Sequence, residues 1–272
     1  MARGGRVAAS SASGRLMLQV QNLVKHFGGV KAVDGVSFEV APGECVALIG
    51  PNGAGKSTSF ACIAGQHVPT GGEVLWQGKL LNRLAPADRL KQGVARTFQV
   101  AQTFEALTVL QNVQLTIESG LGLEALSAYK RLDRQGRETA LALLHTTGLQ
   151  ARAADEVSSL PYGAKKRLEL AMALAARPQL LLLDEPAAGL AEEERADLMR
   201  LVKALAGQGL AVLYTEHNMD AVAGVADRVL VLIEGKLAAQ GSFEDIARDP
   251  IVRSRYLGDG HAQTTSKRPR HA

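Results

Sequence analysis

The sequence predicts an α/β fold built on a mostly parallel sheet that helices cover on both faces. Short apolar segments at residues 45–50 and 180–184 have the pattern of strands that are buried on both sides. Segments with helical periodicity follow them, at residues 59–65 and 192–206. Because apolar strands that alternate with helices are typical of parallel sheets, these two observations together indicate the fold class.

The other elements add two parts to this core. Residues 17–40 alternate apolar and polar positions around a Gly-Gly pair, which predicts two strands, and residues 71–81 predict a hairpin. A helical pattern with one apolar face runs from about Thr108 to residue 157. The last predictions are a helix, a strand and an edge hairpin, at residues 165–175, 211–217 and 227–241. We therefore expect an antiparallel β subdomain at the start and an inserted α-helical subdomain at about residues 105–158.

The composition is that of a globular protein with a buried core, since 46% of the 272 residues are hydrophobic and 21% are charged. No run approaches the roughly 18–20 uninterrupted apolar residues of a membrane span. The net charge of +4 comes from two tails, residues 1–15 and 259–272, whose composition predicts disorder. The domain between them, residues 16–258, is close to neutral, which argues against a nucleic-acid partner. The absence of a secretory signal favours a cytosolic protein.

A glycine-rich loop carries the clearest chemical signal. It matches the phosphate-loop pattern in full and lies between a predicted strand and a predicted helix, which makes a chance glycine-rich turn a poor alternative. Its residues are Gly50, Pro51, Asn52, Gly53, Ala54, Gly55, Lys56, Ser57 and Thr58. The glycines let backbone N–H groups surround phosphates, which the N-terminus of the next helix also attracts. Lys56 would reach the β- and γ-phosphates, and the Ser57 hydroxyl would ligate Mg²⁺.

Two acidic residues and a histidine complete the candidate catalytic set. Asp184 and Glu185 follow the apolar strand at residues 180–184, at the sheet edge where ligands of α/β proteins bind. Asp184 would hold Mg²⁺ through water, and Glu185 would orient and deprotonate the attacking water. Alone, an Asp-Glu pair after a strand is equally typical of a solvated loop. His217 ends another predicted core strand, where it is a packing residue or a ligand-facing one.

Residues 160–190 decide between the kinase, GTPase and helicase families that those motifs allow. The segment LPYGAKKRLELAMALAARPQLLLLDEPAAGL resembles the signature segment of ABC ATPases, followed at their spacing by the magnesium strand. The order of motifs over about residues 17–258 is similar to an ABC nucleotide-binding domain. This resemblance implies a P-loop NTPase fold with a RecA-like, mostly parallel sheet, and ATP and Mg²⁺ as ligands.

The resemblance also implies roles for single residues. Phe27 would stack on adenine, and Gln99 would link Mg²⁺ and water to the membrane partner. His217 would be the switch histidine near the γ-phosphate. The signature that faces the γ-phosphate of a second subunit would be Leu160, Pro161, Tyr162, Gly163 and Ala164. From the residues alone, Phe27 has a core position as its alternative, and Gln99 a place in a solvated loop.

The same resemblance implies partners. Two such domains would sandwich two ATP molecules as a homodimer or heterodimer, and the helical subdomain with Gln99 would receive transmembrane permease subunits. The segments KHFGGVKAVDGVSFEV, RTFQ, LPYG, DEPAAGL and DPIVRSRYLG are most similar to the ATPase subunits of branched-chain amino acid importers. This closer resemblance implies amino-acid import with a solute-binding protein as an indirect partner. It places the chain peripherally on the cytoplasmic face of the inner membrane.

The sequence departs from the general ABC pattern in the signature and after it. Pro161 and Ala164 stand where Ser and Gln are commonest, and Ala191 stands where most members carry an aspartate. Pro161 has neither a hydroxyl nor an N–H to offer the opposing phosphate, which predicts weaker contacts across the dimer. The alternative is that Pro161 is only a helix-start residue. Two other functions remain open: a weakly catalytic regulatory half of a heterodimer, and a soluble ABC ATPase that acts on DNA or ribosomes.

Overall fold

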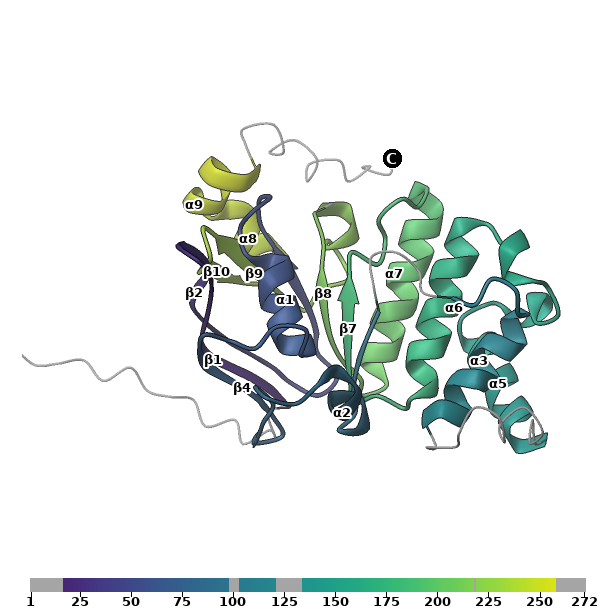
Figure 1. Cartoon of the computed structure of the whole chain (residues 1–272). Coiled ribbons are helices and arrows are strands. Elements are labelled where there is room, and N and C mark those ends of the chain that lie inside the picture. The colour runs from purple at the N-terminus through teal and green to yellow at the C-terminus, as the bar shows by residue number, and fades with distance from the viewer. Residues whose placement is uncertain (1–16, 98–102, 121–133, 218, 258–272) are drawn as a thin grey trace, which may run out of the picture.

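The computed structural model describes residues 17–97, 103–120, 134–217 and 219–257. Figure 1 shows its main parts, with an antiparallel sheet at one end, a helical subdomain at the other and a larger sheet between them. The predictions for the two tails and for Gln99 lie outside these residues. Among the helices that the structure describes, none has the length and apolar character needed to cross a membrane.

The central sheet has six strands in the order β10-β9-β3-β8-β7-β6. The strands are β3 (Cys45–Ile49), β6 (Val94–Arg96), β7 (Leu180–Asp184), β8 (Ala211–Thr215), β9 (Arg228–Ile233) and β10 (Lys236–Gly241). Strand β3 lies between β8 and β9 and is parallel to both, whereas β10 pairs with β9 in the antiparallel direction. The predicted mostly parallel sheet is therefore confirmed.

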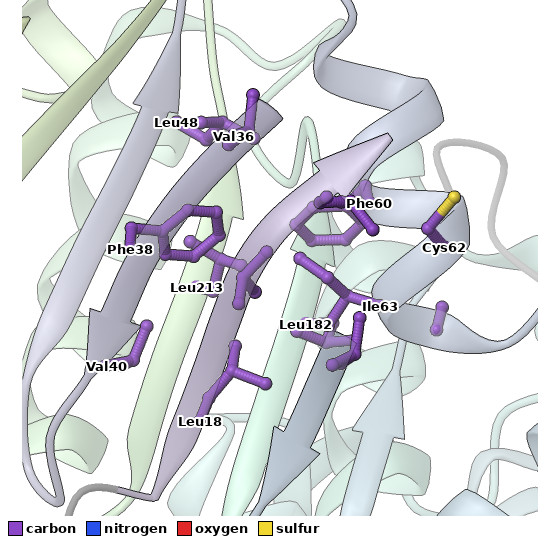
Figure 2. Close-up of a cluster of buried hydrophobic side chains, with 14 of the residues drawn as sticks. Leu18, Val36, Phe38, Val40, Leu48, Phe60, Cys62, Ile63, Leu182 and Leu213 are labelled. Atoms are coloured by element: carbon purple, nitrogen blue, oxygen red, sulfur yellow. The ribbon is translucent and has the colours of Figure 1, made fainter. Parts of the chain in front are cut away.

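Helices cover both faces of this sheet because its central strands are apolar over most of their length and are buried on both sides. Leu180 and Leu182 of β7 point into a core shared with helix α1 (Lys56–Ala64), part of which Figure 2 shows. Leu181 and Leu183 point to the opposite face. There they pack with helices α6 (Tyr162–Ala175) and α7 (Glu192–Gly207). Side chains alternate along a strand, so an unbroken leucine run buries both faces.

A second, antiparallel sheet of four strands covers the α1 face in the order β2-β1-β4-β5. Its strands are β1 (Leu18–Phe27), β2 (Val30–Val40), β4 (Gly71–Trp76) and β5 (Lys79–Leu80). The period of two in the sequence is confirmed in β2, where Val36, Phe38 and Val40 are buried between exposed neighbours. Figure 2 shows these side chains in the same core as Leu48 and Leu182 of the central sheet.

The described part of the helical subdomain has a core of its own. It is built from helices α3 (Val109–Gly120) and α5 (Arg134–Thr146) packed against α6. Leu168 of α6 belongs to this core, whereas Leu170 belongs to the core of the sheet, so α6 joins the two parts. Backbone pairing between Thr108 and Glu156 closes the base of the subdomain.

Several short elements escaped the sequence analysis. They are helix α2 (Pro86–Lys91), strand β6, and the C-terminal helices α8 (Phe243–Arg248) and α9 (Pro250–Val252), which a π-helical turn (Arg253–Leu257) follows. These elements contain three to six residues each, which is too few to show a periodic pattern.

Candidate functional site

The phosphate loop connects β3 to α1, as expected. Two of its glycines are required by the backbone, because Gly50 has φ +147° and Gly55 has φ +96°. A Cβ atom at Gly50 would lie 2.1 Å from the carbonyl oxygen of Leu232, and one at Gly55 would lie 2.4 Å from that of Ala32. The loop backbone therefore packs directly against the backbone of Leu232 and Ala32. Helix α1 begins at Lys56, so the exposed Ser57 lies in its first turn with the N–H groups that attract anions.

Lys56 occupies the centre of this loop. Its ammonium group donates to the carbonyl oxygens of Gly50, over 2.6 Å, and Pro51, over 3.0 Å. Burial lowers the pKa of Lys56, and the nearby charge of Glu185 opposes that shift. Lys56 thus lies inside the loop as a cation close to a catalytic candidate.

Asp184 and Glu185 lie at the carboxyl end of β7, beside the end of β8. The Thr215 hydroxyl donates to Oδ1 of Asp184 over 2.8 Å, and the N–H of Glu185 donates to the same hydroxyl oxygen over 3.0 Å. Oδ2 of Asp184 forms an ion pair of 2.7 Å with Nη2 of Arg96, at the end of β6. Glu185 has φ +45°, a left-handed conformation that is costly for a residue other than glycine and is typical of functional sites.

His217 follows β8 and faces Glu185, with 3.7 Å between its Nδ1 atom and Oε1 of Glu185. The buried carboxylate of Glu216 joins the segments that follow β7 and β8. It accepts the N–H of Ala187 over 3.2 Å and the N–H of His217 over 3.3 Å. The structure therefore brings together Glu185 and His217, which the sequence analysis placed at the ends of two strands. It also adds Glu216, a buried acid that stands directly before His217 in the sequence.

The donors present suit the expected metal ion. Mg²⁺ usually takes one or two protein oxygens and completes its shell with waters and phosphate oxygens. The Ser57 hydroxyl and the Asp184 carboxylate are such oxygens. No cluster of three or more His, Cys, Asp or Glu side chains that could hold a metal alone occurs in the described part of the chain. This donor set fits Mg²⁺ that arrives together with a nucleotide.

Phe27 lies at the end of β1 and has an exposed fraction of 45%. Its ring contacts the ring of His67 edge to face, with 5.3 Å between centroids, and Nζ of Lys25 lies 5.0 Å from its centroid. The alternative of a core position is wrong for Phe27. An exposed aromatic with a cation beside it is suited to bind a planar base.

The signature residues lie at the start of α6, on the sheet face opposite to α1. Pro161 precedes the helix as its N-cap with φ −61°, and Tyr162 is half exposed with its ring against Gly189. A Cβ atom at Gly163 would lie 2.8 Å from Oε1 of Glu194, so a side chain here would displace that carboxylate. Ala191 is the N-cap of α7. In the first turn of α6, Gly163 and Ala164 therefore have backbone N–H groups but no side-chain donors.

The model of the ABC transporter family matches residues 33–188, which include the phosphate loop, the signature and the Asp-Glu pair. The chain belongs to the ABC transporter family. This ABC ATPase is 38% identical over 250 residues to LivG of Escherichia coli, a high-affinity branched-chain amino acid transport ATP-binding protein. The match covers 89% of this chain and 98% of LivG. It is also 36% identical to LptB of Acidithiobacillus ferridurans, a lipopolysaccharide export ATP-binding protein, over 89% of this chain and 97% of LptB.

Solved structures agree with the fold of this ABC ATPase. The ADP-bound ATP-binding cassette MJ1267 of an ABC transporter is 31% identical, with a TM-score of 0.80, and the match covers 90% of this chain and 99% of MJ1267. The dimeric bacterial cassette MJ0796 is 26% identical with a TM-score of 0.72, over 84% of this chain and 99% of MJ0796. The P-loop NTPase fold and the ATPase assignment are therefore confirmed.

Proposed function

We propose that this ABC ATPase hydrolyses Mg-ATP to power the import of branched-chain or related amino acids. The observation that carries the proposal is the likeness to LivG over nearly the whole length of both chains. The segments at residues 25–40, 96–99, 160–163, 184–190 and 249–258 resemble the same importers. The reacting groups expected of such a motor lie at one edge of the central sheet.

Each candidate residue has a role that its position supports. Lys56, released from its loop carbonyls, would offset charge on the β- and γ-phosphates. Glu185 would accept a proton from the attacking water, and His217, 3.7 Å from that carboxylate, would hold water and γ-phosphate in line. Phe27 would stack on adenine. Mg²⁺, held by Ser57 and, through water, by Asp184, would offset negative charge on the phosphates.

A second subunit is needed to complete the site. Helix α1 and the signature helix α6 pack on opposite faces of the sheet, so we propose that the signature of each subunit reaches the nucleotide of the other. The N–H of Gly163, in the first turn of α6, would donate to the opposing γ-phosphate. The dimeric MJ0796 cassette supports such an assembly.

We further propose that permease subunits hold this dimer at the cytoplasmic face of the inner membrane, with Gln99 and the helical subdomain as their contact. Intact Lys56, Asp184, Glu185 and His217 argue against a regulatory half without catalysis. The likeness to transporter proteins over their whole length argues against a soluble ATPase that acts on DNA or ribosomes.

The test is transport by the complete assembly. The tagged chain is purified from native membranes together with its membrane subunits, which are identified and reconstituted in liposomes with ATP inside. We expect ATP-dependent leucine uptake when the solute-binding protein is added, and none with Glu185→Gln in place of the native chain. Copurified subunits that extract lipopolysaccharide instead would overturn the amino-acid proposal and leave the ATPase assignment intact.

A further inference from the structure

Both oxygens of the Asp184 carboxylate are held by donors of the same chain. Oδ1 accepts the Thr215 hydroxyl over 2.8 Å, and Oδ2 pairs with Nη2 of Arg96 over 2.7 Å. The side chains of Arg96 and Asp184 have exposed fractions of only 13% and 15%. A pair with so little contact with water is weakly screened, so the charge of Arg96 acts strongly on this carboxylate.

Arg96 is fixed in this place by contacts from another element. Its guanidinium carbon lies 5.4 Å from the centroid of the Phe60 ring in α1, and the guanidinium also donates to Oε1 of Gln66, just after α1. Its backbone belongs to β6, which pairs with β7 in parallel register. The cation is thus part of the framework around the phosphate loop rather than a mobile surface group.

We propose that Arg96 is a positioning residue that sets the affinity of Asp184 for the divalent cation. Arg96 neutralises the carboxylate before the metal arrives, and its positive charge then opposes the attraction of a second cation to the same carboxylate. The inference rests on the proposed role of Asp184 toward Mg²⁺. Thr215 has the opposite effect, because its neutral hydroxyl orients the carboxylate without opposing a cation.

This assignment predicts effects of opposite sign for the two partners of one carboxylate. Arg96→Met keeps an unbranched side chain against Phe60 and removes the competing charge, so divalent cations should bind more tightly. Thr215→Val keeps the shape and removes the orienting hydroxyl, so they should bind more weakly. Each change should be roughly tenfold, as is typical for groups just outside the ligands of a metal.

Binding of Mn²⁺ measures the affinity of the site for a divalent cation and does not depend on ATP turnover. The full-length chain with Glu185→Gln is saturated with ATP, and free Mn²⁺ is counted by electron paramagnetic resonance. We expect a dissociation constant about tenfold lower with Arg96→Met than in the parent, with ATP affinity in EDTA unchanged. Arg96→Lys should stay near the parent value, because it keeps the charge.

Arg228→Met is the matched control. Arg228, at the start of β9, also forms a 2.7 Å ion pair, with Glu44, and its loss should leave Mn²⁺ affinity unchanged. Arg96→Gln also removes the charge and replaces Arg96→Met if that variant fails to fold. Unchanged or weaker Mn²⁺ binding in the folded, uncharged variant overturns the inference. Asp184→Asn distinguishes failure of the proposed metal role of Asp184 from failure of the inference about Arg96. If Asp184→Asn also leaves Mn²⁺ affinity unchanged, both the metal role of Asp184 and the role of Arg96 are wrong.

Discussion

The ammonium nitrogen of Lys56 lies 2.6 Å from the carbonyl oxygen of Gly50, so the phosphate loop is closed around its own lysine. The ammonium group that would bind the phosphates is already surrounded by the carbonyl oxygens of Gly50 and Pro51. The loop is held in shape before nucleotide arrives, which lowers the cost of ordering it on binding.

Lys56→Ala should reduce ATP hydrolysis at least roughly 100-fold, because the variant loses the cation that offsets phosphate charge. The fold should remain, since α1 is anchored by Phe60 and Ile63 in the core. Steady-state phosphate release and far-UV circular dichroism measure the two effects. Unchanged turnover in the variant would refute the site assignment.

Proton uptake should accompany ATP binding at about pH 9–10, where an ordinary lysine begins to titrate and ATP itself is fully ionised. Burial lowers the pKa of Lys56 in the free chain, so its neutral form appears at lower pH than that of an exposed lysine. The phosphates favour the charged form and restore the proton, and ATP affinity therefore falls as pH rises through the lowered pKa. Calorimetry in two buffers of different ionisation enthalpy measures the uptake. Lys56→Arg, which stays charged, should show none.

Pro161→Ser should strengthen the ATP-bound dimer in a chain whose hydrolysis is blocked by Glu185→Gln. Serine at this N-cap adds a hydroxyl for the opposing phosphate, and it can also accept an N–H of the first turn of α6. Light scattering with Mg-ATP compares the single and double variants. Pro161→Ala is the control, because it removes the ring without adding a hydroxyl. An equal or weaker dimer with Ser would show that Pro161 is only a helix-start residue.

Arg89→Met should lower the free energy of unfolding by about 3 kcal/mol, because it leaves buried carbonyl oxygens without donors. Arg89 is 1% exposed, and its guanidinium donates to four carbonyl oxygens, those of Leu81, Leu84, Cys62 and Ile63. It thereby ties α2 to the end of α1. Urea denaturation measures the loss, and the exposed Arg83→Met should cost under about 0.5 kcal/mol. Equal midpoints for the two variants would contradict this prediction.

Features whose residues are close along the chain could be predicted from the sequence. The phosphate loop, the Asp-Glu pair and the long strands all have local patterns. Arg96, by contrast, meets Asp184 only because β6 and β7 are neighbours, and Glu216 meets Ala187 only because β8 lies next to β7. The local hydrophobic periodicity of a sequence does not determine the order of strands in a sheet, so these partners could not be predicted. The exposure of Phe27 depends in the same way on where β1 ends relative to α1.

The position of β3 between β8 and β9 also constrains how the protein is made. The N–H of Cys45, at the start of β3, donates to Asp227, 182 residues further along the chain. During synthesis, β3, which precedes the phosphate loop, cannot pair with β8 and β9 until nearly the entire chain has been made. Such long-range pairing slows folding and leaves strand edges exposed meanwhile. A nascent chain whose synthesis has stopped before β8 therefore contains every residue of the phosphate loop, and we expect it not to bind ATP.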